Sequence, residues 1–314
     1  MEEMACLFCD RRNQPVVIAE NGFLGRKCDV CGLIYISPRP SVEDIRNLYS
    51  HEQAVRDADV QLGFDNVNRL HARATLRRIK QYTSSGSLLE LGSGGGFFVA
   101  EARAQGFDPF AVELNPIEAK WINEEHRIPC ECSPLSGSSF GGRNFDIVYH
   151  RDVLSHLPNP IATFAEINRA LKPGGLHVFE TGNIADVDAR YYKYFSQFSY
   201  PDHLFFFGER SITNLLGRTG FRASKIRRNP IFLQLLIQKA LWGVKEHLKD
   251  RSTGAVLSSG SSVKKNGTTM KKSLRKLYRY VSFVLIACGR ILPRASRPLK
   301  LIVFARKSAE PCST

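Results

Sequence analysis

The sequence predicts an α/β fold in which short apolar strands alternate with helices. The first observation is residues 88–97, where an apolar run enters a turn dense in glycine and a helix-compatible segment follows. The second is the apolar segment 109–112, which ends in an acidic residue. The third is the apolar segment 144–149, which reads as a buried strand. Strands that alternate with helices in this way indicate a layered fold built on a mostly parallel sheet.

The turn after the first strand has the features of a ligand site. Glu90, Gly92, Gly94 and Gly96 recur at every second position. Because glycine has no Cβ, the backbone can turn sharply there and approach a ligand closely. The following helix points free N–H groups at that ligand, and Glu113, at the tip of the second strand, suits a pair of ribose hydroxyls. These features predict a nucleoside cofactor, and the alternative is a purely structural strand-to-helix turn.

The order of the glycines distinguishes between cofactors. A dinucleotide fingerprint reads Gly-x-Gly-x-x-Gly, whereas residues 92–96 read Gly-x-Gly-x-Gly after an acidic residue. This pattern resembles that of class I S-adenosylmethionine-dependent methyltransferases. The resemblance implies a loop that wraps S-adenosylmethionine, which has no pyrophosphate. The cofactor-binding residues that it implies are Glu90, Gly92, Ser93, Gly94, Gly96, Glu113, Leu114 and His150.

Later segments resemble the same family. They are the fourth strand (144–149), the Lys-Pro-Gly-Gly turn and fifth strand (170–180), the late helix with the entry to strand six (205–221), and the last strand (301–307). The resemblance implies a Rossmann-like sheet of seven strands, mostly parallel, with an antiparallel last strand. It is strongest to the subgroup that includes quinone-biosynthesis and nucleotide-sugar methyltransferases. His150 ends the fourth strand, where the family contacts the methionine half of the cofactor, through either its backbone or its ring.

Four cysteines near the N-terminus are spaced like the ligands of a zinc ribbon. Cys6 and Cys9 form one C-x2-C pair, and Cys28 and Cys31 form another, with 18 residues between the pairs. Four thiolates complete a tetrahedral zinc site with no open position, so we expect a structural role. The alternatives are two disulfides or four free thiols, and we expect each pair to lie on a tight turn.

The chain divides into parts of different composition. We predict a zinc ribbon (1–38), linker and lid helices (39–84), a core (85–230 and 298–308), and a basic amphipathic helical insertion (231–297) whose segment 251–270 is flexible. Ser41 and Asp44 look like a helix-capping pair. The linker resembles that of zinc-ribbon methyltransferases, which implies a lid over the cofactor. Residues 66–82 have the apolar spacing of another helix.

The 314 residues carry a net charge of +14 that is unevenly distributed. Residues 222–314 contain 21 Lys and Arg but 3 Asp and Glu, so the rest of the chain is slightly acidic. Such a basic segment favours an anionic surface, and apolar residues at helical spacing over 271–292 suit the headgroup plane of a membrane. A helix packed on the sheet and a dimer contact are the alternatives. The acidic start of the chain and the lack of an apolar run of about 18 residues predict a cytoplasmic protein, in one version peripheral at the inner face of the membrane.

A methyltransferase that acts on a hydroxyl or a carbon acid needs a base, and histidine suits neutral pH. Tyr200, Asp202 and His203 resemble the Tyr-His-Glu-His segment of sugar C-methyltransferases, and Pro201 departs from it. The resemblance implies that these residues face the substrate, with His203 as the base. Alternatively, Asp202 caps the next helix and His203 holds a loop on the sheet.

His156 is a further catalytic candidate. In quinone-type relatives the matching segment ends in Glu-His and can hold a divalent metal, but Ser155 replaces the glutamate here. A metal site is therefore disfavoured, and packing or hydrogen bonding is the favoured role for His156. Residues 132–135 stand where many relatives place an aspartate near adenine, so backbone groups and apolar packing would hold the base instead.

Three functions are consistent with the sequence. The leading hypothesis is methyl transfer from S-adenosylmethionine to a hydroxyl or carbon of a small or lipid-linked acceptor: a sugar, a glycolipid or polysaccharide precursor, or a quinone-like compound. The second is an RNA methyltransferase that uses the ribbon and the basic tail. No base-flipping motif supports it, so a nucleic-acid partner is disfavoured. The third is a non-catalytic module that keeps the cofactor site as a scaffold.

Overall fold

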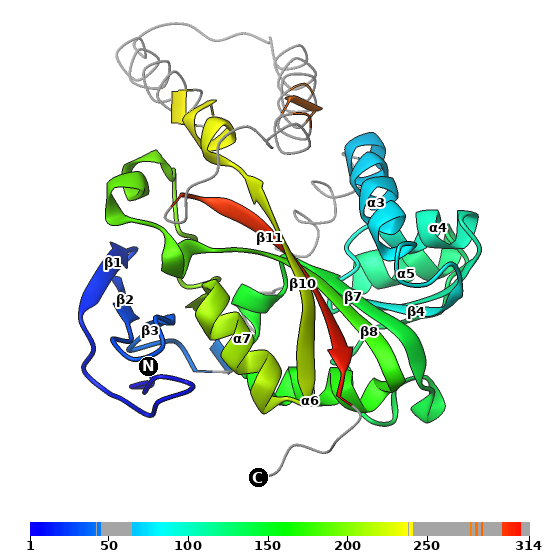
Figure 1. Ribbon diagram of the computed structural model, residues 1–314, viewed down its shortest axis with the longest axis horizontal. Helices are drawn as coiled ribbons and strands as arrows, with labels where there is room; N and C mark the ends of the chain where they lie inside the picture. Colours follow the sequence, from blue (N-terminus) through cyan, green and yellow to red (C-terminus); the bar gives the residue numbers. More distant parts are fainter. Residues whose placement is uncertain are drawn as a thin grey trace, which may run out of the picture.

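The computed structural model describes residues 1–41, 43–44, 65–237, 239–240, 277, 280–281, 284 and 297–308. A seven-stranded sheet lies at the centre, with helices on both of its faces (Figure 1). The order of its strands is β10-β11-β8-β7-β4-β5-β6. A smaller sheet of four strands lies beside it.

The central sheet is mostly parallel. Its strands are β4 (Gly86–Leu91), β5 (Phe107–Val112), β6 (Cys130–Glu131), β7 (Phe145–Arg151), β8 (Leu171–Gly182), β10 (Phe221–Pro230) and β11 (Leu299–Lys307). Every pairing from β8 across to β6 is parallel. Strand β11 inserts between β8 and β10 and runs antiparallel to both. The prediction of seven strands with an antiparallel last strand is confirmed.

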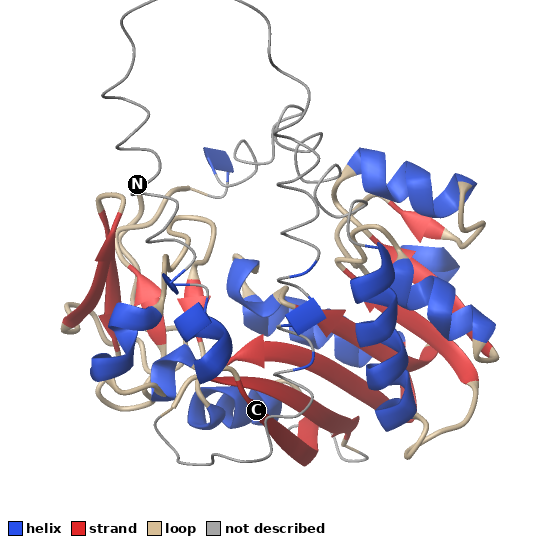
Figure 2. Cartoon of the chain, turned by 90° about the horizontal axis from the view of Figure 1, so that it is seen from above, coloured by secondary structure: helices blue, strands red, loops and turns tan. Residues whose placement is uncertain are grey.

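Helices form a layer on each face of this sheet (Figure 2). The α-helices of these layers are α3 (Asp65–Ile79), α4 (Phe97–Ala104), α5 (Pro116–Glu124), α6 (Pro160–Ala170) and α7 (Glu209–Arg218). The 3₁₀ turns are η1 (Ser139–Gly142), η2 (Leu154–His156), η3 (Ile184–Asp186) and η4 (Ala189–Tyr194). Leu88 packs in the core under α3, α4 and α5, whereas Leu89 packs in the core under α6 and α7. Successive strand residues therefore serve opposite faces, which is why these strands read as continuous apolar runs.

Helices α5 and α6 begin with the same N-terminal cap. Asn115 and Asn159 precede Pro116 and Pro160. The side chain of Asn115 accepts hydrogen bonds from two backbone N–H groups of the first turn, and that of Asn159 accepts one. Proline at the first helical position costs no hydrogen bond there, and its φ is already helical.

The smaller sheet joins the N-terminal ribbon to the core. Its strands are β1 (Val16–Glu20), β2 (Phe23–Lys27), β3 (Ile34–Ile36) and β9 (Phe205–Phe206), all antiparallel. Strand β9 comes from the segment between β8 and α7. It pairs with β3, which lies about 170 residues earlier in the sequence. Residues 205 and 206 were expected to belong to the late helix, and their pairing with β3 was not predicted.

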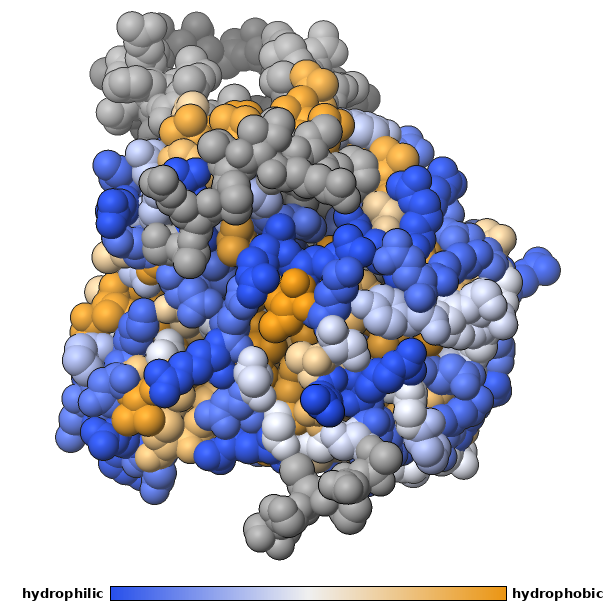
Figure 3. Space-filling model, in the orientation of Figure 1, coloured by the Kyte–Doolittle hydropathy of each residue, from blue (hydrophilic) through white to orange (hydrophobic). Residues whose placement is uncertain are grey.

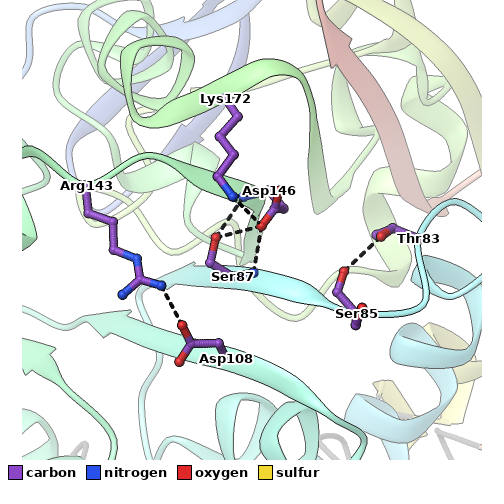
Figure 4. Close-up of polar contacts among 7 residues, drawn as sticks. All are labelled: Thr83, Ser85, Ser87, Asp108, Arg143, Asp146 and Lys172. Carbon is purple, nitrogen blue, oxygen red and sulfur yellow. Dashed lines mark hydrogen bonds and ion pairs between the residues drawn. The ribbon is translucent and has the colours of Figure 1, made fainter.

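Polar contacts hold the amino-terminal ends of the central strands (Figure 4). The Asp146 carboxylate accepts hydrogen bonds of 2.8 Å from the Ser87 backbone N–H and hydroxyl, and it pairs with Lys172 Nζ at 2.8 Å. Nearby, Arg143 donates to Asp108 at 2.6 Å. These contacts tie β4, β5, β7 and β8 together at one edge of the sheet, while the glycine turn leaves β4 at the opposite edge.

Several predicted segments fall on residues that are not described. They are the linker helix beyond Asp44, the segment 251–270 and most of 271–292. The capping pair itself is present: the Ser41 hydroxyl donates to the Asp44 carboxylate at 2.7 Å and accepts from the Asp44 N–H at 3.1 Å. In the described parts of the chain, no helix combines the length and apolar character needed to cross a membrane.

Candidate functional site

The turn after β4 requires glycine. Gly92, Gly94 and Gly96 have φ angles of 66°, 52° and 72°, in the left-handed region. A Cβ on Gly92 would lie 2.6 Å from Val153, and one on Gly96 would lie 2.7 Å from Ile122. The chain therefore turns tightly at the carboxyl edge of the sheet and leads directly into α4.

Glu113 connects this turn to the tip of β5. Its carboxylate accepts hydrogen bonds from the Gly94 N–H at 2.8 Å and from the Asn115 N–H at 2.9 Å. Each oxygen keeps a second lone pair that can accept from a hydroxyl. Burial raises the pKa of the Glu113 carboxyl. Leu114 follows with 59% of its surface exposed, as an apolar platform beside the carboxylate.

Glu90, the next-to-last residue of β4, has a buried carboxyl group with an unused oxygen. Only 5% of the residue is exposed, and its Oε2 has no hydrogen-bond partner among the described residues. Burial raises the pKa of this carboxyl well above its ordinary value, although the positive charge of Arg151 opposes the shift. A buried, unpaired carboxylate is costly, and a cationic ligand group at this point would remove the cost.

His150 does not present its ring in the same way. The ring packs among Phe164, Phe179 and His177, with centroid distances of 5.8, 5.2 and 5.2 Å. This aromatic layer lies under α6, and burial lowers the pKa of His150 to about 3. Of the two contacts that the sequence left open for His150, the backbone is the one that this placement favours.

Three polar side chains meet near the end of β7. His156 comes from η2, and Asp202 and His203 come from the loop that precedes β9. His156 Nδ1 lies 3.0 Å from Asp202 Oδ1, and the two imidazole centroids are 4.6 Å apart. The polar atoms of the three side chains lie within 4.8 Å of one another. The structure thus brings together three of the four predicted catalytic residues, which are 46 or 47 positions apart in sequence.

The two imidazoles have different electrostatic environments. Burial disfavours the charged form of His156, but the hydrogen bond and charge of Asp202 outweigh it and raise the pKa of His156. Burial, and then the neighbouring His156, lower the pKa of His203. His203 Nδ1 lies 2.8 Å from the Phe198 carbonyl oxygen, which can only accept. Nδ1 therefore carries the proton, and Nε2 of the neutral ring keeps its lone pair.

Tyr200, the fourth predicted catalytic residue, lies in the contact between ribbon and core. It is 3% exposed, and its hydroxyl stands 2.1 Å from where a Cβ on Gly25 would be. That hydroxyl has no hydrogen-bond partner among the described residues. Tyr200 therefore packs against β2, and its environment favours a structural role over a catalytic one.

The four N-terminal cysteines form one cluster. Their Sγ atoms all lie within 4.8 Å of one another, and Cys6 and Cys31 are 3.4 Å apart. A tetrahedral metal with bonds of about 2.3 Å would place sulfur atoms about 3.8 Å apart, so these four thiols suit such an ion. The Gly32 N–H donates to the Cys28 carbonyl at 2.9 Å, and the Asp10 N–H donates to the Cys6 carbonyl at 3.0 Å. Each pair therefore lies on a tight turn, as predicted.

Comparison with known proteins identifies the core. Residues 64–225, just over half of the chain, match the model of a family described as a methyltransferase domain. The chain belongs to this family. The match covers the glycine turn, Glu113 and the cluster of His156, Asp202 and His203, and it confirms the predicted resemblance to methyltransferases.

Individual relatives are more distant. The methyltransferase str3 of Strobilurus tenacellus is 35% identical over 104 residues, which is 30% of this chain and 37% of that protein. The chain thus spans little more than a third of the length of this curated relative. Among solved structures, coclaurine N-methyltransferase bound to N-methylheliamine and SAH is 11% identical, with a TM-score of 0.49 over 85% of this chain and 95% of that one. Phospholethanolamine N-methyltransferase 2 of Haemonchus contortus is 19% identical, with a TM-score of 0.45 over 76% of this chain and 52% of that one.

Sequence reasoning missed two groups of residues near the site. One is Glu20 and Asn21 in the turn between β1 and β2, which contact the loop of His203. The Asn21-Gly22 dipeptide is a hairpin signal that could have located this turn, but nothing local reveals its distant contact. The other is Glu180 at the end of β8, whose partners come from β7 and from α3.

Proposed function

We propose that this protein transfers a methyl group from S-adenosylmethionine to a hydroxyl or carbon of a small-molecule acceptor. The observation that carries the proposal is the buried Glu90 carboxylate with its unused oxygen, next to a turn that only glycine can form. S-adenosylmethionine has the ammonium group that such a carboxylate requires, and a dinucleotide would present a pyrophosphate to it instead.

The residues at the carboxyl edge of the sheet fit the parts of this cofactor. Glu90 would hold the ammonium group and Glu113 the ribose diol, while Leu114 offers an apolar surface for adenine. The glycine turn, including Ser93, gives the ligand close access to the backbone. When bound, S-adenosylmethionine supplies a methyl group that is already activated for displacement.

We assign His203 as the general base. Its ring is neutral and its Nε2 is free to accept the proton of an acceptor hydroxyl or carbon acid. His156, whose charged form Asp202 favours, would offset negative charge that develops on the acceptor. We favour these roles over a divalent metal because Ser155 replaces the glutamate of metal-binding relatives and Asp202 already hydrogen-bonds His156.

A polar cavity supports a hydrophilic acceptor. It has a volume of about 480 Å³ and lies between the β1–β2 turn and the loop of residues 196–202. Its lining includes Glu20, Gln197 and Asp202, the last of which reaches the histidine pair. This lining favours a sugar or a glycolipid or polysaccharide precursor over a quinone-like compound.

We further propose that zinc occupies the cysteine cluster, because the distances between its four sulfur atoms suit a tetrahedral ion.

We also propose that the insertion contacts an anionic membrane surface. In Figure 3 apolar surface gathers at the top of the view, where Figure 1 places the described residues of the insertion. Leu233, Leu277 and Val284 are 50%, 61% and 52% exposed there. Apolar residues in so basic a segment suit a lipid surface, and a lipid-linked acceptor would be consistent with it.

Calorimetric titration with S-adenosylmethionine tests the cofactor assignment. We expect saturable binding to the wild-type chain and none to Gly94→Asp, which would place a charge and a strained side chain in the turn. An exposed surface change, Glu124→Gln, is the matched control and should bind normally. Failure of the wild-type chain to bind would end the proposal.

Transfer of isotope-labelled methyl groups tests the acceptor class. Nucleotide sugars, lipid-linked glycans, catechols and RNA should be compared under the same conditions. We expect label in a carbohydrate and a loss of about 100-fold or more with His203→Gln, within the range of general base catalysis. Label in RNA alone would contradict the assignment.

A further inference from the structure

We propose that the turn between β1 and β2 of the ribbon positions the catalytic loop, with Glu20 and Asn21 as positioning residues. The inference rests on the proposed function, because it concerns the loop that carries Asp202 and His203. It assigns the N-terminal ribbon a part in catalysis, although none of its own side chains reaches the histidine pair.

Glu20 holds the loop with both oxygens of its carboxylate. Oε1 accepts from the Phe198 N–H at 2.7 Å, and Oε2 accepts from the Tyr200 N–H at 2.8 Å. Hydrogen bonds from N–H groups to a charged acceptor are about twice as strong as neutral ones. Phe198 is also the residue whose carbonyl fixes the proton on His203 Nδ1. The carboxylate of Glu20 therefore holds the same residue whose carbonyl sets the tautomer of the base.

Asn21 adds a third bond from the same turn. Its side-chain amide donates to the Tyr200 carbonyl at 2.8 Å. Glu20 and Asn21 thus bind both the N–H and the C=O of Tyr200, which only Pro201 separates from Asp202 and His203. Ser199, between the two bound residues, has a φ of 65°, an uncommon backbone conformation that persists only where its surroundings fix it.

The ring of Tyr200 also packs against the ribbon, at Gly25 of β2. Gly25 of β2 has no Cβ, and any larger residue would collide with the Tyr200 hydroxyl. A glycine in the middle of a strand weakens that strand, so its presence under Tyr200 marks a close approach. The buried Tyr200 is in this account an anchor for the loop.

Strand pairing continues the attachment beyond His203. The Leu204 carbonyl accepts from the Ile36 N–H of β3 at 3.1 Å, and the Leu204 N–H donates to the Ser155 carbonyl at 2.8 Å. Leu204 therefore links the ribbon to the 3₁₀ turn that carries His156. The distance between the two imidazoles therefore depends on the hydrogen bonds of Leu204 and on those that Glu20 and Asn21 make to residues 198 and 200.

Titration of the imidazoles by ¹⁵N NMR, in the full zinc-loaded chain, tests the inference without an acceptor. In the wild-type chain we expect the pKa of His156 above that of His203, because Asp202 faces His156 and burial acts on both. Glu20→Ala and Asn21→Ala should each reduce this separation, Glu20→Ala by more than half. The control is Asp29→Ala in the same ribbon, whose exposed pair with Arg11 has no contact with the loop.

The outcomes separate this inference from the proposed function. Equal separations in the wild-type chain, Glu20→Ala and Asn21→Ala would overturn the positioning role, and so would a wild-type chain with no separation. If Glu20→Ala loses its zinc, the test depends on the separation of the two imidazole pKa values in Asn21→Ala, which keeps the Glu20 carboxylate. With an acceptor in hand, we expect Glu20→Ala to lower kcat at least 10-fold and to leave the affinity for S-adenosylmethionine within twofold. A chain that shows the imidazole changes but binds no S-adenosylmethionine would refute the proposed function alone.

Discussion

Glu90 illustrates how one residue can be costly to the free protein and useful to the complex. Its carboxyl is buried beside Glu113, which adds a like charge, and one of its oxygens has no partner among the described residues. The free protein therefore favours the protonated form, whereas a bound ammonium group favours the ionised form. Cofactor binding should release a proton over the pH range between these two states.

This gives a prediction for the pH dependence of binding. The affinity for S-adenosylmethionine should rise with pH until Glu90 ionises in the free protein, and the binding enthalpy should vary with the ionisation enthalpy of the buffer. Glu90→Gln should weaken binding about 10- to 100-fold, as expected for a lost bond to a charged group, and should abolish the buffer dependence. A Gln variant that binds as tightly as the wild-type chain would contradict this role.

His150 and His177 form a second buried titratable pair. Their ring centroids are 5.2 Å apart, both residues are almost fully buried, and among the described residues no ring nitrogen of either has a hydrogen-bond partner. Burial lowers the pKa of His150 to about 3 and that of His177 well below its ordinary value. Both rings are therefore neutral in the folded protein at neutral pH.

The pair should make the fold sensitive to mild acid. The folded-state pKa values lie below the unfolded value of about 6.5, so this stability is present above pH 6.5 and is lost as pH falls below it. Each histidine contributes a slope of about 1.4 kcal/mol per pH unit. The free energy of unfolding, measured with urea between pH 6.5 and 5, should fall less steeply with decreasing pH for His177→Leu than for the wild-type chain. Equal slopes would show that the pair has no such effect.

The local sequence predicted the glycine turn after β4, because the end of a strand, a tight turn and the requirement for glycine all depend on neighbouring residues. The same patterns could not orient His150, since the direction of a strand side chain depends on which face the strand presents to α6. Nor could they place Tyr200, whose hydroxyl lies against Gly25, some 175 positions earlier. The catalytic role that the family resemblance implies for this segment stays a prediction, and only the structure shows that Tyr200 packs against Gly25.

At the scale of elements, α3 is held on the sheet by polar contacts under its apolar face. Glu180 of β8 is fully buried and accepts from the Thr75 hydroxyl at 2.9 Å and the Tyr149 hydroxyl at 3.0 Å. His71 of α3 is a further neighbour, with its Nε2 3.2 Å from a carboxylate oxygen of Glu180. Burial opposes the ionisation of Glu180, but the positive charges around it outweigh burial, so its pKa lies below the ordinary value.

Two substitutions measure this attachment. Glu180→Gln should cost about 3 kcal/mol of unfolding free energy, because it leaves the partly buried cationic groups around it, Arg151 and Lys300, without a compensating charge. Thr75→Val should cost about 1 kcal/mol. Glu166→Gln on α6, in a pair with the exposed Arg169, should cost less than about 0.5 kcal/mol. Urea denaturation measures all three. A cost for Glu180→Gln no larger than that of Glu166→Gln would contradict the account.

The apolar spacing of residues 66–82 predicted α3 correctly, because the periodicity of a helix is visible in its own sequence. Strand β9 was missed because two residues carry no periodicity of their own. Its pairing depends on β3, 170 positions earlier, and such contacts exist only once the ribbon and the core have folded against each other.

At the scale of the molecule, the ribbon and the core share a sheet. Zinc bound by the four cysteines would therefore stabilise more than the ribbon. We expect Cys9→Ser to lose bound zinc and to lower Tm by several degrees, at about 2–4 °C for each kcal/mol lost. Cys132→Ser, which changes an exposed thiol outside the cluster, should keep both. Metal analysis and calorimetry decide the matter, and a wild-type chain that contains no zinc would contradict the prediction.

The central claim concerns the carboxyl edge of the sheet, where Glu90 and Glu113 flank a turn made of glycine. A crystal structure with S-adenosylmethionine tests it most directly. The account predicts the ammonium group within about 3 Å of Glu90 and the ribose hydroxyls on Glu113. The absence of S-adenosylmethionine from this edge of the sheet at saturating concentration, or NAD bound there instead, would contradict it.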